Sequence, residues 1–513
     1  MRAGRGALAA LMIVAVLAQA GPGAAAPKVH GDRLIPVDKK SVETPFAMSV
    51  VALIDSGINP YSSAFRDKSA LAYRHPSTYI PGYPKDAIRL NLHLDVPYED
   101  AVKLDEDAWK GVVRGKLYWV PGTRIIGAIS FGAGGGNCPV VETPPANTLQ
   151  QSCPEHTILD DHGHGTMTAS RAGGAPASLA PNARIVEIEG LGAKGVRWAA
   201  DQGWIDVQSN SWINFVPQPV PGATTDAFAY ASDKTLTLAA SGNGTAYITG
   251  FAPTPTYLLS TAPPGVVLVG GHDNGKMTLW AGAPPHVVAD AYAGMSAIHD
   301  SIEPMRPDPI ACCTSAASPY AAGGAAAIIT EARRILGDRS TGIHEGIVAE
   351  GADCATWPDE GPLDDGMFTL DELKQVYFHT AEAHPAEGKD DGDIHWAGEP
   401  RAPDHPELGP GANPFCFGCT TTPVAWKQIP EDGDLAYPLI GYGGINENSV
   451  ALAAKVLSGK EPIPDRTQAD AQYDLDQQIR RAMSGEGADT EILAFDHLAV
   501  SCAVVVVAGK PKP

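Results

Sequence analysis

Four polar residues, widely separated along the chain, are of the types that together cleave an amide: Asp55, His164, Asn243 and Ser315. A serine hydroxyl is a weak nucleophile, so it needs a histidine to accept its proton. The histidine needs a carboxylate that fixes its tautomer and stabilises its positive charge. An asparagine amide can stabilise the oxyanion that forms on the attacked carbonyl. The four residues therefore predict nucleophilic acyl chemistry, provided that the fold brings them together.

Each of these residues lies in a short segment with a structural signature. Asp55 ends the apolar run 48–54 and Asn243 follows another apolar run, so both are expected at the carboxyl end of a buried strand. His164 and Ser315 each begin a segment with a helical pattern. Because a helix N-terminus favours nearby negative charge, Ser315 is well placed to face an oxyanion.

Each residue alone has a simpler interpretation. Asp55 can be a turn residue, and Ser315 can cap the helix that follows it. His162 and His164 form a His-x-His pair that can bind a metal, but no further ligand cluster has suitable spacing. Asn243 begins a glycosylation sequon, which we interpret as coincidental because a glycan there would block an oxyanion site.

Short apolar runs alternate with helical patterns through most of the chain, which predicts a parallel sheet with helices on both faces. The strand candidates are 48–54, 184–189, 205–211, 235–240, 266–270 and 499–507, and the helix candidates are 195–202, 315–336, a helix that opens with a capping box at Thr369, and 469–483. Ligands bind such sheets at the carboxyl ends of the strands. Residues 65–150 and 384–435 lack this alternation and are expected to be long irregular insertions.

The four segments resemble the motifs of the subtilisin-like serine proteases (subtilases) and follow the family's order Asp, His, Asn, Ser. The matching segments are Asp55-Ser56-Gly57 for D-[ST]-G, His164-Gly165-Thr166 for H-G-T, Ser241-Gly242-Asn243 for the oxyanion segment, and Thr314-Ser315-Ala316-Ala317-Ser318-Pro319 for most of G-T-S-x-A-S-P. The resemblance implies a subtilisin-like three-layer α/β fold: a mostly parallel central sheet, helices on both faces and two large insertions.

The resemblance also implies roles for the four polar residues. Ser315 would attack the scissile carbonyl, and His164 would act as general base and then as general acid. Asp55 would orient His164. The Asn243 side chain and the Ser315 N–H would form the oxyanion hole.

The substrate-binding residues that the resemblance implies are Ser211, Trp212, Ile213, Asn214, Ser241 and Gly242. The family has two glycines where this chain has Ile213 and Asn214, so we expect a differently shaped cleft. Cys313 stands where the family has a glycine, directly before the Thr-Ser pair of the nucleophile. The segment between Asp55 and His164 is longer than usual in the family, and the insertion at 65–150 accounts for the difference.

The N-terminus has the pattern of a secretory signal. Arg2 and Arg5 precede the apolar stretch 7–17, and Ala18-Gln19-Ala20, with alanines at its first and third positions, offers a cleavage site. We therefore expect a secreted, extracellular protein with no transmembrane segment in the mature chain. The predicted organisation is a signal peptide at 1–20, an N-terminal extension at 21–44, a catalytic domain at 45–460 and a C-terminal tail at 461–513. The extension is too short for the family's usual inhibitory propeptide.

Composition limits the partners and cofactors. The formal net charge of −22 repels nucleic acid phosphates, so we expect no nucleic acid partner. We also expect a monomer that acts on a protein or peptide. Eight cysteines allow 105 pairings, of which Cys138–Cys153 is the favoured one. Cys416 and Cys419 form a CxxC that suits a structural disulfide, or two separate bridges, better than zinc. A vicinal Cys312–Cys313 disulfide is a further alternative. Catalysis requires no cofactor, and the resemblance adds structural calcium without assignable ligands.

These observations predict a serine endopeptidase that hydrolyses peptide bonds through an acyl-enzyme. Two alternatives remain open. The altered residues near Ser315 and in the substrate strand are also compatible with a catalytically impaired binding protein. The same triad could also serve a peptide ligase or cyclase, in which an amine rather than water resolves the acyl-enzyme.

Overall fold

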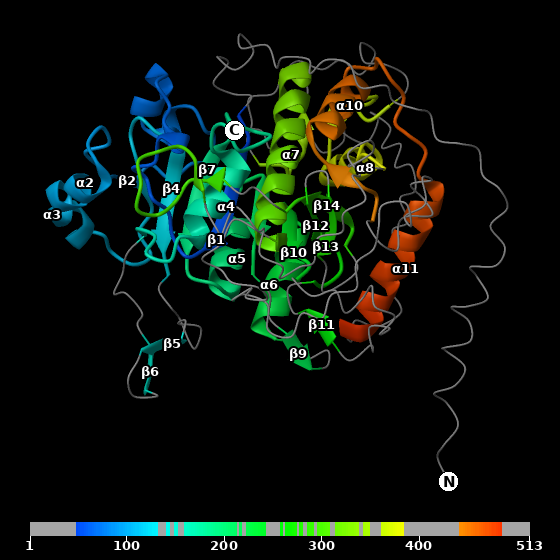
Figure 1. Ribbon diagram of the computed structural model, residues 1–513. Coiled ribbons are helices and arrows are strands. Elements are labelled where there is room, and N and C mark those ends of the chain that lie inside the picture. Colours follow the sequence, from blue (N-terminus) through cyan, green and yellow to red (C-terminus); the bar gives the residue numbers. More distant parts are fainter. Residues whose placement is uncertain are drawn as a thin grey trace, which may run out of the picture. The chain divides into compact units, whose positions relative to one another are not determined.

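The computed structural model describes residues 48–131, 140–143, 148–151, 158–212, 215–217, 222–242, 257–259, 262–273, 276–280, 285–291, 295–307, 313–337, 342–348, 361–383 and 441–484. Within these residues, an eleven-stranded sheet has the order β19-β14-β12-β10-β8-β1-β7-β4-β3-β2, and β13 pairs with β12. Figure 1 shows this sheet with the long helix α7 crossing it.

The strands of the main sheet are β1 (Val50–Asp55), β2 (Ile88–Arg89), β3 (Tyr118–Trp119), β4 (Ile125–Ser130), β7 (Arg184–Glu189), β8 (Val207–Asn210), β10 (Leu236–Ala240), β12 (Val267–Asp273), β13 (Lys276–Trp280), β14 (Val287–Asp290) and β19 (Gly444–Ile445). Smaller antiparallel pairs are β5 (Val140–Thr143) with β6 (Thr148–Gln151), β9 (Phe215–Pro217) with β11 (Tyr257–Leu259), β15 (Met295–Ser296) with β16 (Arg306–Pro307), and β17 (Ile347–Val348) with β18 (Met367–Phe368). The pairings from β19 through β4 are parallel, which confirms the predicted mostly parallel sheet.

The helices are α2 (Tyr98–Leu104), α3 (Glu106–Lys110), α4 (His164–Gly173), α5 (Ala193–Asp201), α6 (Ala223–Ser232), α7 (Cys313–Leu336), α8 (Leu370–His379), α10 (Glu447–Leu457) and α11 (Thr467–Ser484). The predicted capping box at Thr369 is present, since its side chain and that of Glu372 bond each other's backbone N–H groups. Gly337, which follows α7, has φ +69°, as expected for a glycine after a helix end. The strand candidate 499–507 lies outside the described residues.

One region differs from its prediction. Residues 65–150 were expected to be irregular, yet β4 extends the main sheet beside β7, and β3 and β2 continue it. The physical signal is present in the run Ile125–Ser130, whose residues are all buried. The strand pattern was not recognised in the sequence because β4 contains a glycine and because β2 and β3 are only two residues long. The second insertion, 384–435, lies outside the described residues.

Side-chain alternation along β1 divides the core into two layers. Val51 and Leu53 contact the cluster that includes α4 and α7, whereas Val50, Ala52 and Ile54 contact the cluster that includes α5 and α6. Successive side chains of a strand point to opposite faces, so a continuous apolar run is what a strand covered on both faces requires. By the same alternation Asp55 points to the face of α4.

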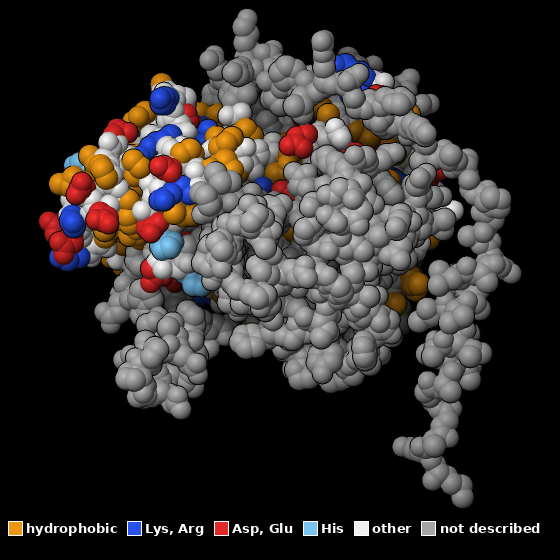
Figure 2. Space-filling model, viewed as in Figure 1, with side chains coloured by type: hydrophobic (Ala, Val, Ile, Leu, Met, Phe, Trp, Pro, Cys, Tyr) orange, Lys and Arg blue, Asp and Glu red, His pale blue; other side chains and the backbone are white. Residues whose placement is uncertain are grey.

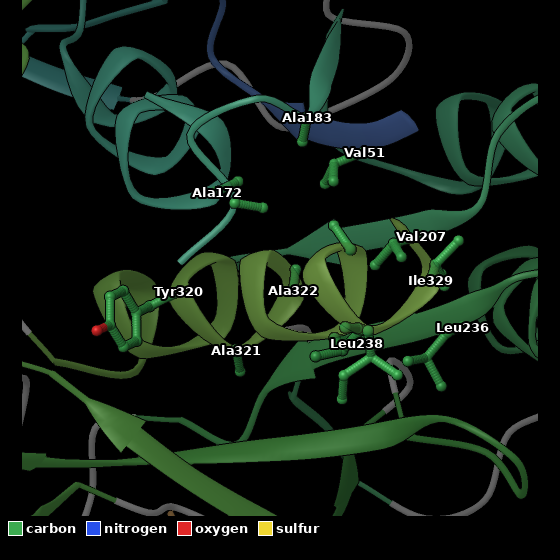
Figure 3. Close-up of a cluster of buried hydrophobic side chains, with 14 of the residues drawn as sticks. Val51, Ala172, Ala183, Val207, Leu236, Leu238, Tyr320, Ala321, Ala322 and Ile329 are labelled. Atoms are coloured by element: carbon green, nitrogen blue, oxygen red, sulfur yellow. The ribbon is translucent and has the colours of Figure 1, made fainter. Parts of the chain in front are cut away.

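The helix α7 is rich in small residues because it packs closely on its neighbours. Figure 3 shows Ala321, Ala322 and Ile329 of α7 among side chains of β1, β8, β10 and α4. A Cβ atom on Gly323 would stand 2.8 Å from the Ala172 carbonyl oxygen of α4. Close packing of this kind holds α7 against α4, and those two helices carry Ser315 and His164.

The surface around α2 and α3 mixes acidic, basic and hydrophobic side chains (Figure 2). Among the described residues, no helix is both long enough and apolar enough to cross a bilayer.

Candidate active site

Asp55 closes the buried strand β1, and its carboxylate is held from three sides. Oδ1 accepts hydrogen bonds from the Ser56 N–H at 2.8 Å and from His164 Nδ1 at 2.7 Å. Oδ2 accepts from the Thr168 hydroxyl at 3.2 Å. The Asp55 side chain is 4% exposed and that of His164 is 23% exposed. A neutral imidazole that donates its Nδ1 proton to a carboxylate keeps Nε2 as its proton acceptor.

The turn before α4 is organised by Asp160, a residue that the sequence analysis did not single out. Its Oδ1 accepts hydrogen bonds from the N–H groups of His162 and Gly163 and from the Ser56 hydroxyl. Its Oδ2 accepts from both the N–H and the hydroxyl of Thr166. This one carboxylate therefore joins the start of α4 to the turn after β1. The available signal was an acidic residue four positions before His164, at the expected start of a helix.

Steric and hydrogen-bonding requirements explain why glycine and threonine follow His164. A Cβ atom on Gly165 would stand 2.1 Å from the Gly57 carbonyl oxygen, so only glycine allows α4 to lie so close to the turn after β1. The Thr166 hydroxyl accepts a hydrogen bond from the Asn59 N–H at 2.9 Å. The His-Gly-Thr motif is thus the set of residue types that brings His164 within bonding distance of Asp55.

Ser315 is the third residue of α7 and is partly buried. Its hydroxyl donates to the Ser211 carbonyl oxygen at 3.1 Å, and the Ser211 hydroxyl donates to the Ser315 carbonyl oxygen at 3.0 Å. Because Ser211 directly follows β8, these reciprocal bonds place Ser315 at the carboxyl end of the strand next to β1. The predicted nucleophile and one predicted substrate-binding residue are therefore in direct contact.

The residue before Thr314 keeps a glycine-like backbone although it is a cysteine. Cys313 has φ +70°, and within the described residues it is the one non-glycine residue with positive φ. Glycine adopts this conformation without steric cost, so Cys313 preserves the geometry that a glycine would provide there. Cys313 is disulfide-bonded. The other seven cysteines, Cys138 and Cys153 among them, lie outside the described residues.

Arg171 joins the two helices that carry His164 and Ser315, and it too was missed by sequence reasoning. Its Nε donates to the Ala316 carbonyl oxygen at 3.5 Å, and its guanidinium lies 4.3 Å from the ring centroid of Tyr320. The same guanidinium pairs with Asp290 at 3.2 Å. Nothing in the motif pattern marked this arginine, since its role depends on the spatial contact of α4, α7 and β14.

The structure describes three of the remaining predicted site residues, Trp212, Ser241 and Gly242. Trp212 is buried, and its ring centroid lies 5.4 Å from that of Phe228, with an interplanar angle of 67°. Ser241 and Gly242 follow β10, and Gly242 has φ +95°. Asn243, Ile213 and Asn214 lie outside the described residues.

The described part of the chain contains no group of three or more His, Cys, Asp or Glu side chains suited to hold a metal ion, and structural calcium stays a prediction.

Comparison with known proteins gives the family. The model of the subtilase family matches residues 48–396. No curated protein sequence matches the chain. The chain is similar to the solved structure of a mutant of the protease domain of PatA, with 14% identity, 80% of this chain and 96% of that chain covered, and a TM-score of 0.38. It is also similar to the epidermin leader peptide processing serine protease EpiP from Staphylococcus aureus, with 12% identity, 80% and 76% covered, and a TM-score of 0.37. A third similar structure is that of the prenylagaramide maturation protease PagA, with 13% identity, 82% of this chain and 99% of that chain covered, and a TM-score of 0.37. Because the family model spans more than half of its length, the chain belongs to the subtilase family.

Proposed function

We propose that the protein is a secreted serine endopeptidase that hydrolyses peptide bonds through an acyl-enzyme, with Asp55, His164 and Ser315 as its triad. The observation that carries this proposal is the 2.7 Å contact between Asp55 Oδ1 and His164 Nδ1 at the carboxyl end of β1. Subtilases are serine proteases, and this contact is the part of a triad that prepares a histidine to accept a proton.

The bonds of Ser315 suggest how substrate binding readies the nucleophile. The Ser315 hydroxyl donates to the Ser211 carbonyl oxygen. A peptide substrate that binds along the segment directly after β8 donates a backbone N–H to the Ser211 carbonyl oxygen. This peptide N–H therefore competes with the Ser315 hydroxyl for the same acceptor. The displaced hydroxyl is then available to His164 Nε2, which takes its proton as Ser315 Oγ bonds to the substrate carbonyl carbon.

The later steps return the proton and regenerate the enzyme. His164 gives the proton to the leaving amine as the peptide C–N bond breaks, which leaves an ester on Ser315 Oγ. A water molecule then loses a proton to His164, attacks the ester carbonyl and releases the acid, and the proton returns to Ser315. The Ser315 N–H at the start of α7 and the Asn243 side chain would stabilise the oxyanion, and each such donor contributes about 10²- to 10³-fold in rate.

An active-site probe tests the proposal against the impaired-binding alternative. A fluorophosphonate should label the wild-type chain on Ser315 and should not label Ser315→Ala. A matched control is Ser318→Ala, since Ser318 lies on the same helix but is buried against Ser209, and labelling should persist there. Equal, poor labelling of wild type and Ser315→Ala would instead establish a non-catalytic binding protein.

Product analysis then separates hydrolysis from ligation. Mass spectrometry of a digested peptide library should show two linear fragments for each cleaved peptide, with one oxygen of the new carboxyl derived from labelled water. Joined or cyclic products would replace the hydrolase proposal by the ligase. For the secretion proposal, N-terminal sequencing of the exported chain should begin at Gly21, directly after Ala18-Gln19-Ala20.

A further inference from the structure

A second carboxyl group, Glu187, lies directly behind the Asp55–His164 pair. Glu187 is on β7, where it is opposite Leu53 of β1, and its side chain is fully buried. Its Oε1 accepts a hydrogen bond from the Gly57 N–H at 3.3 Å. Oε2 has no hydrogen-bond partner among the residues that the structure describes. An ionised carboxylate with so few partners would be costly to bury, so the site favours the protonated acid.

The position of Glu187 links it to both parts of the His–Asp pair. Gly57 belongs to the turn that follows Asp55, so the bond to Glu187 holds that turn. A Cβ atom on Gly165 would stand 3.1 Å from Glu187 Oε1, which places the carboxyl group beneath the first turn of α4, next to His164 in sequence. Glu187 thus contacts the turn after β1 and the start of the helix that carries the base.

The largest charge effects on Glu187 come from negatively charged groups. The groups that act on it are Asp55 of β1, Asp160 before α4 and Glu189 of β7, and His164 is the titratable group next to it on α4. Burial, followed by the charges of Asp55 and Asp160, raises the pKa of Glu187 well above its usual value, and the Gly57 N–H offsets this only in part.

We propose that Glu187 is a positioning residue for the triad: a buried, neutral carboxylic acid that fixes the Asp55–Gly57 turn and keeps a second negative charge away from the Asp55–His164 pair. This inference rests on the proposed function for its effect on catalysis. Its structural part, the neutral acid, is independent of catalysis. A neutral acid accepts the Gly57 N–H with its carbonyl oxygen and adds no charge to a site where His164 must gain and lose a proton.

Two substitutions separate the hydrogen-bond acceptor from the charge. Glu187→Gln keeps a carbonyl oxygen for Gly57 and is neutral, so its kcat/KM at pH 6–7 should stay within about threefold of wild type. Glu187→Leu leaves the Gly57 N–H buried without a partner and should lower kcat/KM about tenfold with little change in KM. The control is Glu331→Gln on α7, whose carboxylate pairs with Arg334, and it should change neither value.

The pH dependence of kcat/KM gives a signature that a purely structural role would not produce. Once rising pH ionises the wild-type Glu187, its negative charge lies beside Asp55 and stabilises the imidazolium of His164. The wild-type profile should therefore diverge from that of Glu187→Gln on its alkaline side only. Full rescue by glutamine at neutral pH together with this divergence supports the proposal.

Stability measurements test the neutral acid without any use of activity. A group whose pKa is higher in the folded than in the unfolded chain loses stabilisation as pH rises from its unfolded value, here 4.5. The Tm of Glu187→Gln should therefore rise relative to wild type from about pH 4.5 upward, while Glu331→Gln should not show this trend. This comparison also decides the matter where Glu187→Leu fails to fold.

Several results would overturn the proposal. Activity of Glu187→Gln as low as that of Glu187→Leu would mean that an ionised carboxylate is required. Wild-type activity in Glu187→Leu would mean that Glu187 does not position the triad. Parallel Tm curves for wild type and Glu187→Gln would exclude the neutral acid. If the fluorophosphonate fails to label wild type, the proposed function fails, and the Tm curves still decide the state of Glu187.

Discussion

Two histidine–aspartate pairs in this chain have similar lengths and different surroundings. His164 Nδ1 lies 2.7 Å from Asp55 at the end of β1, and His286 Nε2 lies 3.0 Å from Asp476 of α11. His286 is 2% exposed and uses both ring nitrogens, since its Nδ1 accepts the Leu268 N–H at 3.1 Å. His164 is 23% exposed and uses Nδ1 for Asp55. The two pairs therefore differ in the exposure of the histidine side chain, which is 23% for His164 and 2% for His286.

The second pair belongs to the attachment of the C-terminal helix. Arg480 donates to Asp476 and to the Ala262 carbonyl oxygen, and Gln477 accepts the Gly265 N–H. His379 of α8 pairs with Asp470 at 2.9 Å. These contacts lie around the amino ends of β12 and β14 and the end of α8, whereas Asp55 and Ser211 lie at carboxyl ends. The pair with Asp476 thus holds α11 against the sheet, whereas the proposed function assigns the pair with Asp55 to catalysis.

The largest expected effect distinguishes the two pairs through catalysis. Asp55→Asn should lower kcat/KM about 10⁴-fold, because the asparagine amide favours the wrong tautomer of His164. The melting temperature should change little, since the side chain keeps its shape. Asp476→Asn should leave kcat/KM within about threefold of wild type. Comparable losses of activity in both variants would refute the division of roles.

The next effect concerns stability and is expected for α11 alone. Asp476→Ala removes the acceptor for both Arg480 and His286 and should lower the free energy of unfolding by about 2 kcal/mol. Urea denaturation measures this loss, and limited proteolysis should show earlier cleavage within 467–484. Asp474→Ala, on the same helix, is the control and should cost far less. Equal stability of the two variants would show that Asp476 does not attach the helix.

The sequence predicted the elements that alternate along the chain better than the additions to them. The run before Asp55 and the run 184–189 became β1 and β7, because strands buried on both faces need continuous apolar residues. The contacts of Asp160 and Arg171 could not be predicted, since each depends on which segments meet in space. Pairing of His286 with Asp476, 190 positions away, has no local signal at all.

The same limit applies to the triad itself. Motif order predicted that Asp55 and His164 would meet, and the 2.7 Å distance agrees with this. The positive φ of Cys313 could not be foreseen, because a cysteine in that position is sterically unusual and only the fold around it imposes the conformation. Glu187 gave no signal either, since a glutamate in the middle of a strand pattern looks like a solvent-facing residue.

A smaller effect sharpens the comparison through pH. Burial lowers the pKa of His286, and the Asp476 hydrogen bond offsets this only in part. A histidine whose pKa is lower in the folded chain binds fewer protons there, so the folded state loses stability as pH falls below the unfolded value of 6.5. Burial would raise the pKa of Asp476, but Arg480 and His286 outweigh it and lower that pKa, so Asp476 adds its own loss only in stronger acid.

The expected result is a wild-type Tm that falls between pH 7 and 5 more steeply than that of His286→Asn, in which the asparagine oxygen can still accept the Leu268 N–H. Differential scanning calorimetry across this range measures the difference. Curves of equal slope would show that His286 does not sense the acidification.

The smallest effect probes the third support of Asp55. Thr168 donates to Asp55 Oδ2 at 3.2 Å and can also donate to the Gly165 carbonyl oxygen at 3.0 Å, and one hydroxyl proton serves one acceptor at a time. Thr168→Val keeps the shape and removes the proton, so Asp55 loses a neutral hydrogen bond worth about 1 kcal/mol, which corresponds to about a fivefold lower kcat/KM. Thr168→Ser keeps the hydroxyl and should restore the rate. If valine and serine variants both match wild type, the hydroxyl bonds Gly165 throughout the reaction and Asp55 is held by Ser56 and His164 alone.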